Sequence, residues 1–173
     1  MKKHTFEEVE ELLKNNPEVE SKIMHLRDHG DPPKECSIRA AEALLGVTFP
    51  EDYRRFLLKW GYLNTIAEIY GIGSKDENNL FSSWSIRYTL EGRLPSDLPI
   101  GTNLPSYYVV IYSFEGDAYH CIDTRDPDGK VISWNFFDAC YEWDIADSFV
   151  DYLYNQIIET KESMENESED QIF

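Results

Sequence analysis

The sequence is poor in cysteine and has no long apolar run. Its 173 residues include three cysteines, Cys36, Cys121 and Cys140, and no two of them form a Cys-x-x-Cys pair. This pattern argues against a disulfide framework and favours a reducing compartment. No stretch approaches the roughly 18 apolar residues of a membrane span. The first 16 residues, MKKHTFEEVEELLKNN, lack the apolar core of a secretory signal and have helical spacing instead. We therefore expect a cytoplasmic protein.

Positive charge is also scarce. The chain has 16 Lys and Arg against 33 Asp and Glu, which gives a formal net charge of -17. Such a surface repels phosphate backbones and anionic membranes, so we expect neither nucleic acid nor a membrane as a partner. It would attract a basic protein or a metal ion. The simpler alternative, which charge alone favours, is that acidity keeps the protein in solution.

Signatures of catalysis are missing as well. The chain has no Gly-x-Ser-x-Gly elbow and no complete phosphate-binding glycine loop. His120 and Cys121 are neighbours in an expected strand, so their side chains point to opposite faces and cannot form a dyad. Cys140 has no basic neighbour that would lower its pKa. We expect no enzymatic activity, no catalytic residue and no cofactor; a hydrolase or metalloenzyme is the least favoured alternative.

Two groups of residues could be read as metal ligands. His25 and His29 are four apart, as on one helix face, but Gly30 follows, and a solvated helix end explains the pair better. The segment DTRDPDG, Asp123 to Gly129, has three carboxylates without the order of a calcium loop. A hairpin turn with Asp side chains on backbone N–H groups is the better explanation. We predict no metal site, but the sequence alone does not decide whether either group ever binds a metal ion.

Apolar spacing predicts helices at both ends of the chain and strands between them. The expected helices cover about residues 6–16, 18–27, 38–45, 50–60, 79–90 and 145–158. The first has a capping box, Thr5 with Glu8, and Pro17 ends it. Ser37 and Asp144 are the other expected caps. Pro50 suits the first position of its helix, and Gly61 suits its end.

The middle of the chain contains short β-rich runs joined by turn sequences. They cover residues 97–101, 107–113, 118–124 and 130–135, and residues 67–73 are also strand-like. Helices, then strands, then a helix predict a single α+β domain with a central, largely antiparallel twisted sheet flanked by N-terminal and C-terminal helices. We expect a helical extension over 1–35, the α+β domain over 36–158, and an acidic disordered tail over 159–173.

Aromatic residues make up 14% of the chain. Most must be buried in a domain of this size, but exposed aromatics ringed by carboxylates would suit a protein interface. The candidates, which the sequence alone does not sort, are Tyr62, Tyr70, Tyr107, Tyr108, Tyr112, Trp134, Phe136, Phe137, Tyr141 and Trp143.

The stretch EALLGVTFPEDYRRFLLKWG, Glu42 to Gly61, resembles the signature of the SUKH superfamily. Members carry a helix ending in Glu-x-x-x-Gly, then Leu-Pro, an acidic pair, Tyr, and an amphipathic helix closing in Asn-Gly. Here Phe49 and Trp60 replace the usual Leu and Asn. Weaker matches follow at 69–71, 97–101, 116–123 and 148–153, so the similarity covers about Ile38 to Ile158.

The resemblance implies an α+β domain that binds proteins and has no enzymatic activity. Bacterial members are mostly immunity proteins that neutralise a toxin, commonly a nuclease or deaminase. We therefore expect an immunity protein that binds a basic toxin domain through an acidic surface. A regulatory or scaffolding module, like the fungal regulators of cell-wall synthesis, is the alternative.

Carboxylates at the expected hairpin tips are the predicted partner contacts. They are Glu115, Asp117, Asp126 and Asp128. For each of these residues taken singly, a solvated turn is the stronger explanation. The oligomeric state stays open.

Overall fold

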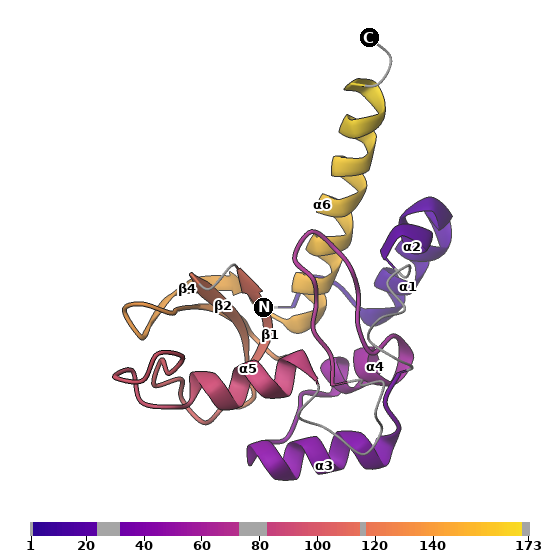
Figure 1. Cartoon of the computed structure of the whole chain (residues 1–173). Coiled ribbons are helices and arrows are strands. Elements are labelled where there is room, and N and C mark those ends of the chain that lie inside the picture. The colour runs from indigo at the N-terminus through magenta and orange to yellow at the C-terminus, as the bar shows by residue number, and fades with distance from the viewer. Residues whose placement is uncertain (1, 24–31, 73–82, 115–116, 171–173) are drawn as a thin grey trace.

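The computed structural model describes residues 2–23, 32–72, 83–114 and 117–170. Within them the chain forms six helices and one four-stranded antiparallel sheet (Figure 1). The helices are α1 (Phe6–Asn15), α2 (Pro17–Ile23), α3 (Glu35–Leu45), α4 (Glu51–Lys59), α5 (Trp84–Gly92) and α6 (Phe149–Asp170). The strands are β1 (Tyr108–Phe114), β2 (Ala118–Asp123), β3 (Val131–Asn135) and β4 (Cys140–Ala146). The predicted α+β class, with helices flanking an antiparallel sheet, is confirmed.

The N-terminal capping box is present as predicted. The Glu8 amide donates to Thr5 Oγ1 at 3.2 Å, and the Thr5 amide donates to Glu8 Oε2 at 2.6 Å. Pro17 does more than end this run, because it is also the first residue of α2. That position suits proline, since the missing N–H has no helical acceptor there.

The starts of α3 and α4 differ from the predicted ones by three residues and one residue. Ser37 lies inside α3, which begins at Glu35, so it is not the cap. Pro50 is the cap of α4 rather than its first residue. The predicted end at Gly61 holds, since Gly61 adopts the left-handed conformation with a φ of 72°; Gly46, with a φ of 68°, ends α3 in the same way.

The strand order in the sheet is β1-β2-β3-β4, and every neighbouring pair is antiparallel. The predicted run at 97–101 is not a strand. Its Gly101 turns tightly, and a Cβ there would lie 2.0 Å from the Pro95 carbonyl oxygen. Residues 67–73 were also expected to be strand-like. Up to residue 72, where the described segment ends, they form only one isolated β-bridge, between Ile69 and Leu63. The fourth strand is instead β4, which the sequence did not predict.

The last helix begins later and ends later than predicted. Ser148 caps it, and its Oγ accepts the amide of Asp151 at 3.0 Å. Asp144, the predicted cap, lies in β4. The helix continues to Asp170, so residues 159–170 are helical where composition predicted a disordered tail. Figure 1 shows the last turns of this helix projecting beyond the rest of the fold.

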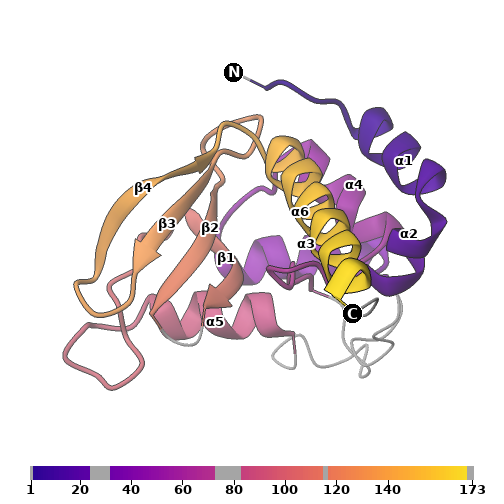
Figure 2. The same ribbon diagram turned by 90° about the horizontal axis from the view of Figure 1, so that it is seen from above.

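Both faces of the sheet are packed. The larger core joins one face to α4 and α6, with Phe56 and Phe149 at its centre. The smaller core covers the other face with Tyr119, Cys121 and Trp134. Figure 2 shows that β1 lies toward the helices and β4 lies at the outer edge, farthest from them.

Candidate functional site

The structure places the predicted contact carboxylates at opposite ends of β2. Asp117 directly precedes β2 and is exposed. Asp126 and Asp128 lie in the turn that follows β2. Glu115 lies outside the described residues. The described members of this set therefore do not converge on one surface.

The turn between β2 and β3 is held by its own side chains. Arg125 donates to the Asp123 carboxylate through Nε at 2.9 Å and Nη2 at 2.6 Å. Burial raises the pKa of Asp123, but the hydrogen bonds from Arg125 outweigh it and lower that pKa overall. Asp126 Oδ1 accepts the Asp128 amide at 2.9 Å. These contacts fit the hairpin-turn interpretation rather than a calcium loop.

No cluster of three or more potential metal ligands occurs among the residues that the structure describes. His25 and His29 lie outside those residues.

The inner edge of the sheet is closed by α5. The Val110 amide donates to Thr89 Oγ1 at 2.9 Å, and Ser85 Oγ donates to the Val110 carbonyl at 2.6 Å. A backbone bond from Tyr70 to the Ile111 carbonyl, 2.7 Å long, adds to this closure. Two hydroxyls of a helix thus occupy the hydrogen-bonding groups that a neighbouring strand would use.

The outer edge, β4, is open. In the described part of the chain, no group outside the sheet hydrogen-bonds to the main chain of β4. Its register with β3 is irregular between Val131 and Ile132 and again between Ile132 and Trp134. Such bulges and the charged side chains of β4 are how natural sheets discourage the addition of another strand.

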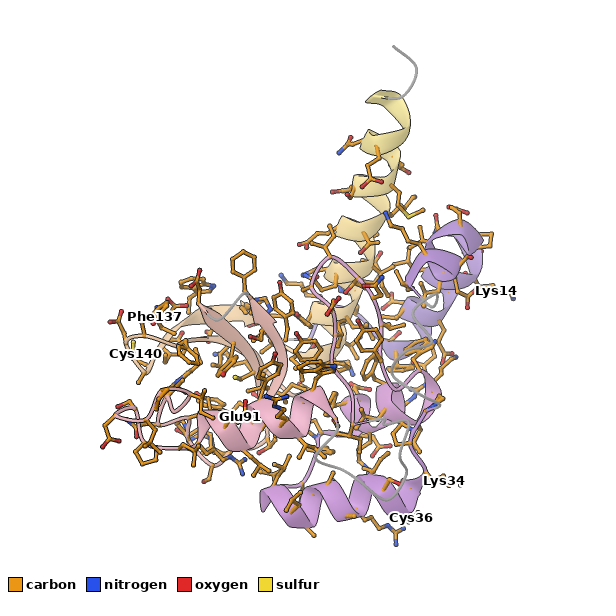
Figure 3. All side chains as sticks on the ribbon, in the orientation of Figure 1. Lys14, Lys34, Cys36, Glu91, Phe137 and Cys140 are labelled. Atoms are coloured by element: carbon orange, nitrogen blue, oxygen red, sulfur yellow. The ribbon has the colours of Figure 1, made fainter. Side chains whose placement is uncertain are left out.

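Three large aromatic side chains are exposed on the β3–β4 hairpin. Phe137 is 75% exposed, Trp143 57% and Tyr141 48%. We call these three residues the hairpin surface. Figure 3 shows Phe137 at the end of the sheet that lies away from α1, α2 and α6. The loop between α5 and β1, with exposed Leu98 and Ile100, extends to the same end in Figures 1 and 2.

A polar network fixes the shape of this hairpin. Glu142 accepts hydrogen bonds from Ser133 Oγ at 2.5 Å and from Asn135 Nδ2 at 2.9 Å, and these bonds lower its pKa. Asn135 Oδ1 in turn accepts the amide of Asp138 at 2.7 Å, inside the turn. Ala139 completes the turn with a φ of 50°. The tip is thereby held in one conformation without help from a partner.

Carboxylates flank the hairpin surface. Asp117 and Asp138 are exposed beside the tip, and the Asp117 carbonyl accepts the amide of Phe136 at 3.0 Å. Asp144 is also exposed, next to Lys130 Nζ at 2.6 Å and the Tyr141 hydroxyl at 3.1 Å. Exposed aromatics among carboxylates are the arrangement that the composition led us to expect of a protein interface.

Among the described residues, the two neighbouring reactive groups His120 and Cys121 lie in different environments. His120 lies 2.9 Å from the Tyr152 hydroxyl, in the larger core, while Cys121 faces the smaller one. The expectation that these neighbours lie on opposite faces is confirmed. Burial lowers the pKa of His120 to about 4 and raises that of Cys121. Cys140 is exposed on β4.

The N-terminal segment is anchored to α6 in a shallow depression of about 190 Å³. The carboxylate of Asp151 accepts the amides of Lys3 and His4 at 2.9 Å and 2.8 Å. His4 also stacks on Tyr154, with ring centroids 3.8 Å apart. This depression is used to hold the chain together, which makes the hairpin surface the better candidate for a functional site.

Comparison with known families agrees with the resemblance seen in the sequence. The chain matches the family model SUKH_5, described as SMI1-KNR4 cell-wall, over residues 7–158. The match extends from α1 into α6 and includes the whole hairpin surface. A comparison with curated proteins finds no significant match. None of the described helices combines the length and apolar character needed to cross a membrane.

Proposed function

Because the chain belongs to the SUKH superfamily, through its SMI1-KNR4 family, we propose that it is an immunity protein. It binds a cognate bacterial toxin domain of the nuclease or deaminase type in the cytoplasm and blocks it without catalysing a reaction. The family acts through protein binding, so a protein partner is the starting point for every further step.

The charge of the chain is the observation that carries this proposal. A net charge of -17 is unsuited to phosphate-containing ligands but complements a basic surface. Toxin domains that act on nucleic acid need such a surface to hold their substrate. An acidic inhibitor can occupy it and associate faster through electrostatic steering. The candidate contacts are the hairpin-tip carboxylates Glu115, Asp117, Asp126 and Asp128; Asp117 lies at one end of β2 and Asp126 and Asp128 at the other, so one partner surface need not meet all of them.

A regulatory module of the cell-wall-synthesis type is the second candidate. The description of the matched family, SMI1-KNR4 cell-wall, favours it. Such a module would bind its partner without inhibiting a toxin. The gene next to this one separates the two candidates, because immunity genes usually lie beside a toxin gene.

Co-expression tests the proposal directly. The toxin domain encoded by the adjacent gene is induced in bacteria with or without this chain, and growth is followed. We expect growth to be rescued and the two proteins to elute as one complex in gel filtration. The association rate should fall at least about tenfold from low to high salt, as steering requires. Loss of both rescue and complex would overturn the proposal, and a complex without rescue would favour the regulatory module.

A further inference from the structure

We propose that the hairpin surface, Phe137 with Tyr141 and Trp143, is the binding element, and that Phe137 inserts into an apolar depression of the partner rimmed by Lys or Arg. This inference rests on the proposed function and adds to it the surface that binds and the chemistry of the surface that is bound.

The exposure of these aromatics is the first argument. Single exposed apolar residues are ordinary on a protein surface. Here three occur within seven residues of one hairpin, and Leu98 and Ile100 are exposed on the loop at the same end. Exposed apolar side chains that gather at one end of a molecule are typical of interaction sites, and Trp and Tyr are enriched among the residues that dominate binding energy.

The fixed shape of the hairpin is the second argument. Phe137 packs edge-on against Phe136, with centroids 5.7 Å apart, and Phe136 packs in the same way against the buried Tyr119 at 5.8 Å. The Glu142–Asn135–Asp138 network holds the turn from the other side. An aromatic that is already ordered loses little conformational freedom on binding, so more of its contact energy appears as affinity.

The charges around the hairpin decide which kind of partner fits. Asp117 and Asp138 flank the tip, so a bound surface must bring positive charge to them. A second copy of this chain, docked hairpin to hairpin, would place these carboxylates against each other. The bulges of β4 also oppose strand-to-strand pairing of two copies. A basic protein of a different kind is therefore the occupant.

The opposite end of the sheet lacks this combination. Asp126 and Asp128 belong to a turn in which the Asp126 carboxylate accepts the Asp128 amide, and no large exposed apolar residue lies in residues 124–130. Of the described carboxylates that the sequence suggested, the inference assigns Asp117 to the interface and leaves Asp126 and Asp128 outside it.

An aromatic truncation with a matched control tests the inference. Phe137→Ala and Trp143→Ala are compared with Ile66→Ala, which removes an apolar side chain that is 56% exposed beside α6. We expect the dissociation constant for the toxin domain to rise at least about 30-fold for the first two and to stay unchanged for the third. Circular dichroism confirms that all three variants are folded. Equal affinities for Phe137→Ala and wild type would overturn the inference.

A second pair of variants separates local contacts from total charge. Asp117→Asn/Asp138→Asn and Asp126→Asn/Asp128→Asn each remove two negative charges, but from opposite ends of the sheet. The first variant should weaken binding and flatten its salt dependence, whereas the second should leave the affinity within about twofold of wild type. A larger loss for the second variant would place the interface at the other end and overturn the inference.

Crosslinking distinguishes failure of this inference from failure of the proposed function. A photoreactive benzoylphenylalanine replaces Phe137 or, as the control, Ile66, in the native host. The inference is supported if mass spectrometry identifies one basic protein that crosslinks at position 137 and not at position 66. The same protein should bind the purified Phe137→Ala variant more weakly than the wild-type chain. If that protein is not a toxin and growth is not rescued, the immunity proposal fails while the inference stands. If growth is rescued but nothing crosslinks at position 137, the inference fails while the immunity proposal stands.

Discussion

The Tyr152 hydroxyl of α6 lies 2.9 Å from Nδ1 of His120 in β2 and joins the helix to the sheet through a hydrogen bond. The imidazole also packs edge-on against Tyr112, with centroids 4.8 Å apart. Burial among these rings disfavours the charged imidazole and lowers the pKa of His120 to about 4, from an ordinary value of 6.5. His120 is therefore neutral in the folded protein at pH 7.

This neutral histidine predicts a loss of stability in mild acid. Below pH 6.5 the unfolded chain binds a proton at His120 that the folded chain does not bind until about pH 4. The contribution of His120 is therefore complete above pH 6.5 and is lost as the pH falls toward 4, by up to about 3 kcal/mol. Urea unfolding of wild type and His120→Gln between pH 7.5 and 4.5 measures it. The carboxylates titrate in both proteins, so identical pH slopes would contradict the prediction.

The aromatic centre of the larger core predicts a large effect of Phe56→Ala. Phe56 is fully buried and packs against Phe149, with ring centroids 5.3 Å apart. Removing the ring leaves a cavity and should lower the free energy of unfolding by about 3–5 kcal/mol. Leu58→Ala, two residues along the same helix and 45% exposed, should lower it by less than about 1 kcal/mol. Chemical denaturation compares the two, and similar losses would show that this ring is not part of the core.

Two glycines should respond differently to alanine. A Cβ at Gly71 would lie 1.4 Å from the Gly61 carbonyl oxygen, and neither backbone can move cheaply. Gly71→Ala should lower the melting temperature sharply, with a loss of about 3 kcal/mol or more. Gly46 has open space around its Cβ position but a φ of 68°, so Gly46→Ala should cost only about 1–2 kcal/mol. The reverse order in thermal unfolding would be inconsistent with this backbone packing.

The closed edge of the sheet predicts that Thr89→Val destabilises although the side chains have nearly the same shape. The variant leaves the buried Val110 amide without its acceptor, which should cost about 1–3 kcal/mol. Adding Ser85→Ala frees the Val110 carbonyl as well and should make the protein associate at high concentration. Urea unfolding and sedimentation velocity provide the two measurements. A fully stable, monomeric double variant would mean that α5 is not needed to close this edge.

The sequence was sufficient to predict a helix where the residues that determine it all lie within one short segment. The Thr5–Glu8 capping box and the helix from Glu51 to Lys59 have their charges and apolar spacing within a few residues, and both form, although the helix begins one residue later than predicted. The start of α6 was missed because Asp144 and Ser148 are both plausible caps. The pairing of Ala146 with Val131, a contact that sequence spacing does not reveal, commits residues up to 146 to the sheet.

The candidate site was the hardest part to predict, for a related reason. β4 does carry a strand signal, because the apolar residues Tyr141, Trp143 and Ile145 alternate with Glu142 and Asp144, but the predicted helix cap at Asp144 cut that run short. Without β4, nothing separated the exposed Tyr141 and Trp143 from the buried Trp134. The acidic tail was misjudged because composition predicts disorder. Met164, partly buried against the core, instead holds α6 to the rest of the fold.

The anchoring of Lys3 by Asp151 has a consequence for synthesis of the chain. These two residues are 148 positions apart, and α1 completes its packing only against α6. A ribosome that has just made α1 must produce the whole sheet before α6 emerges to receive it. The newly made domain therefore cannot close until almost all of it has left the ribosome. The packing of α1 against α6 is thus among the last contacts that the new chain can form, after all four strands have been made.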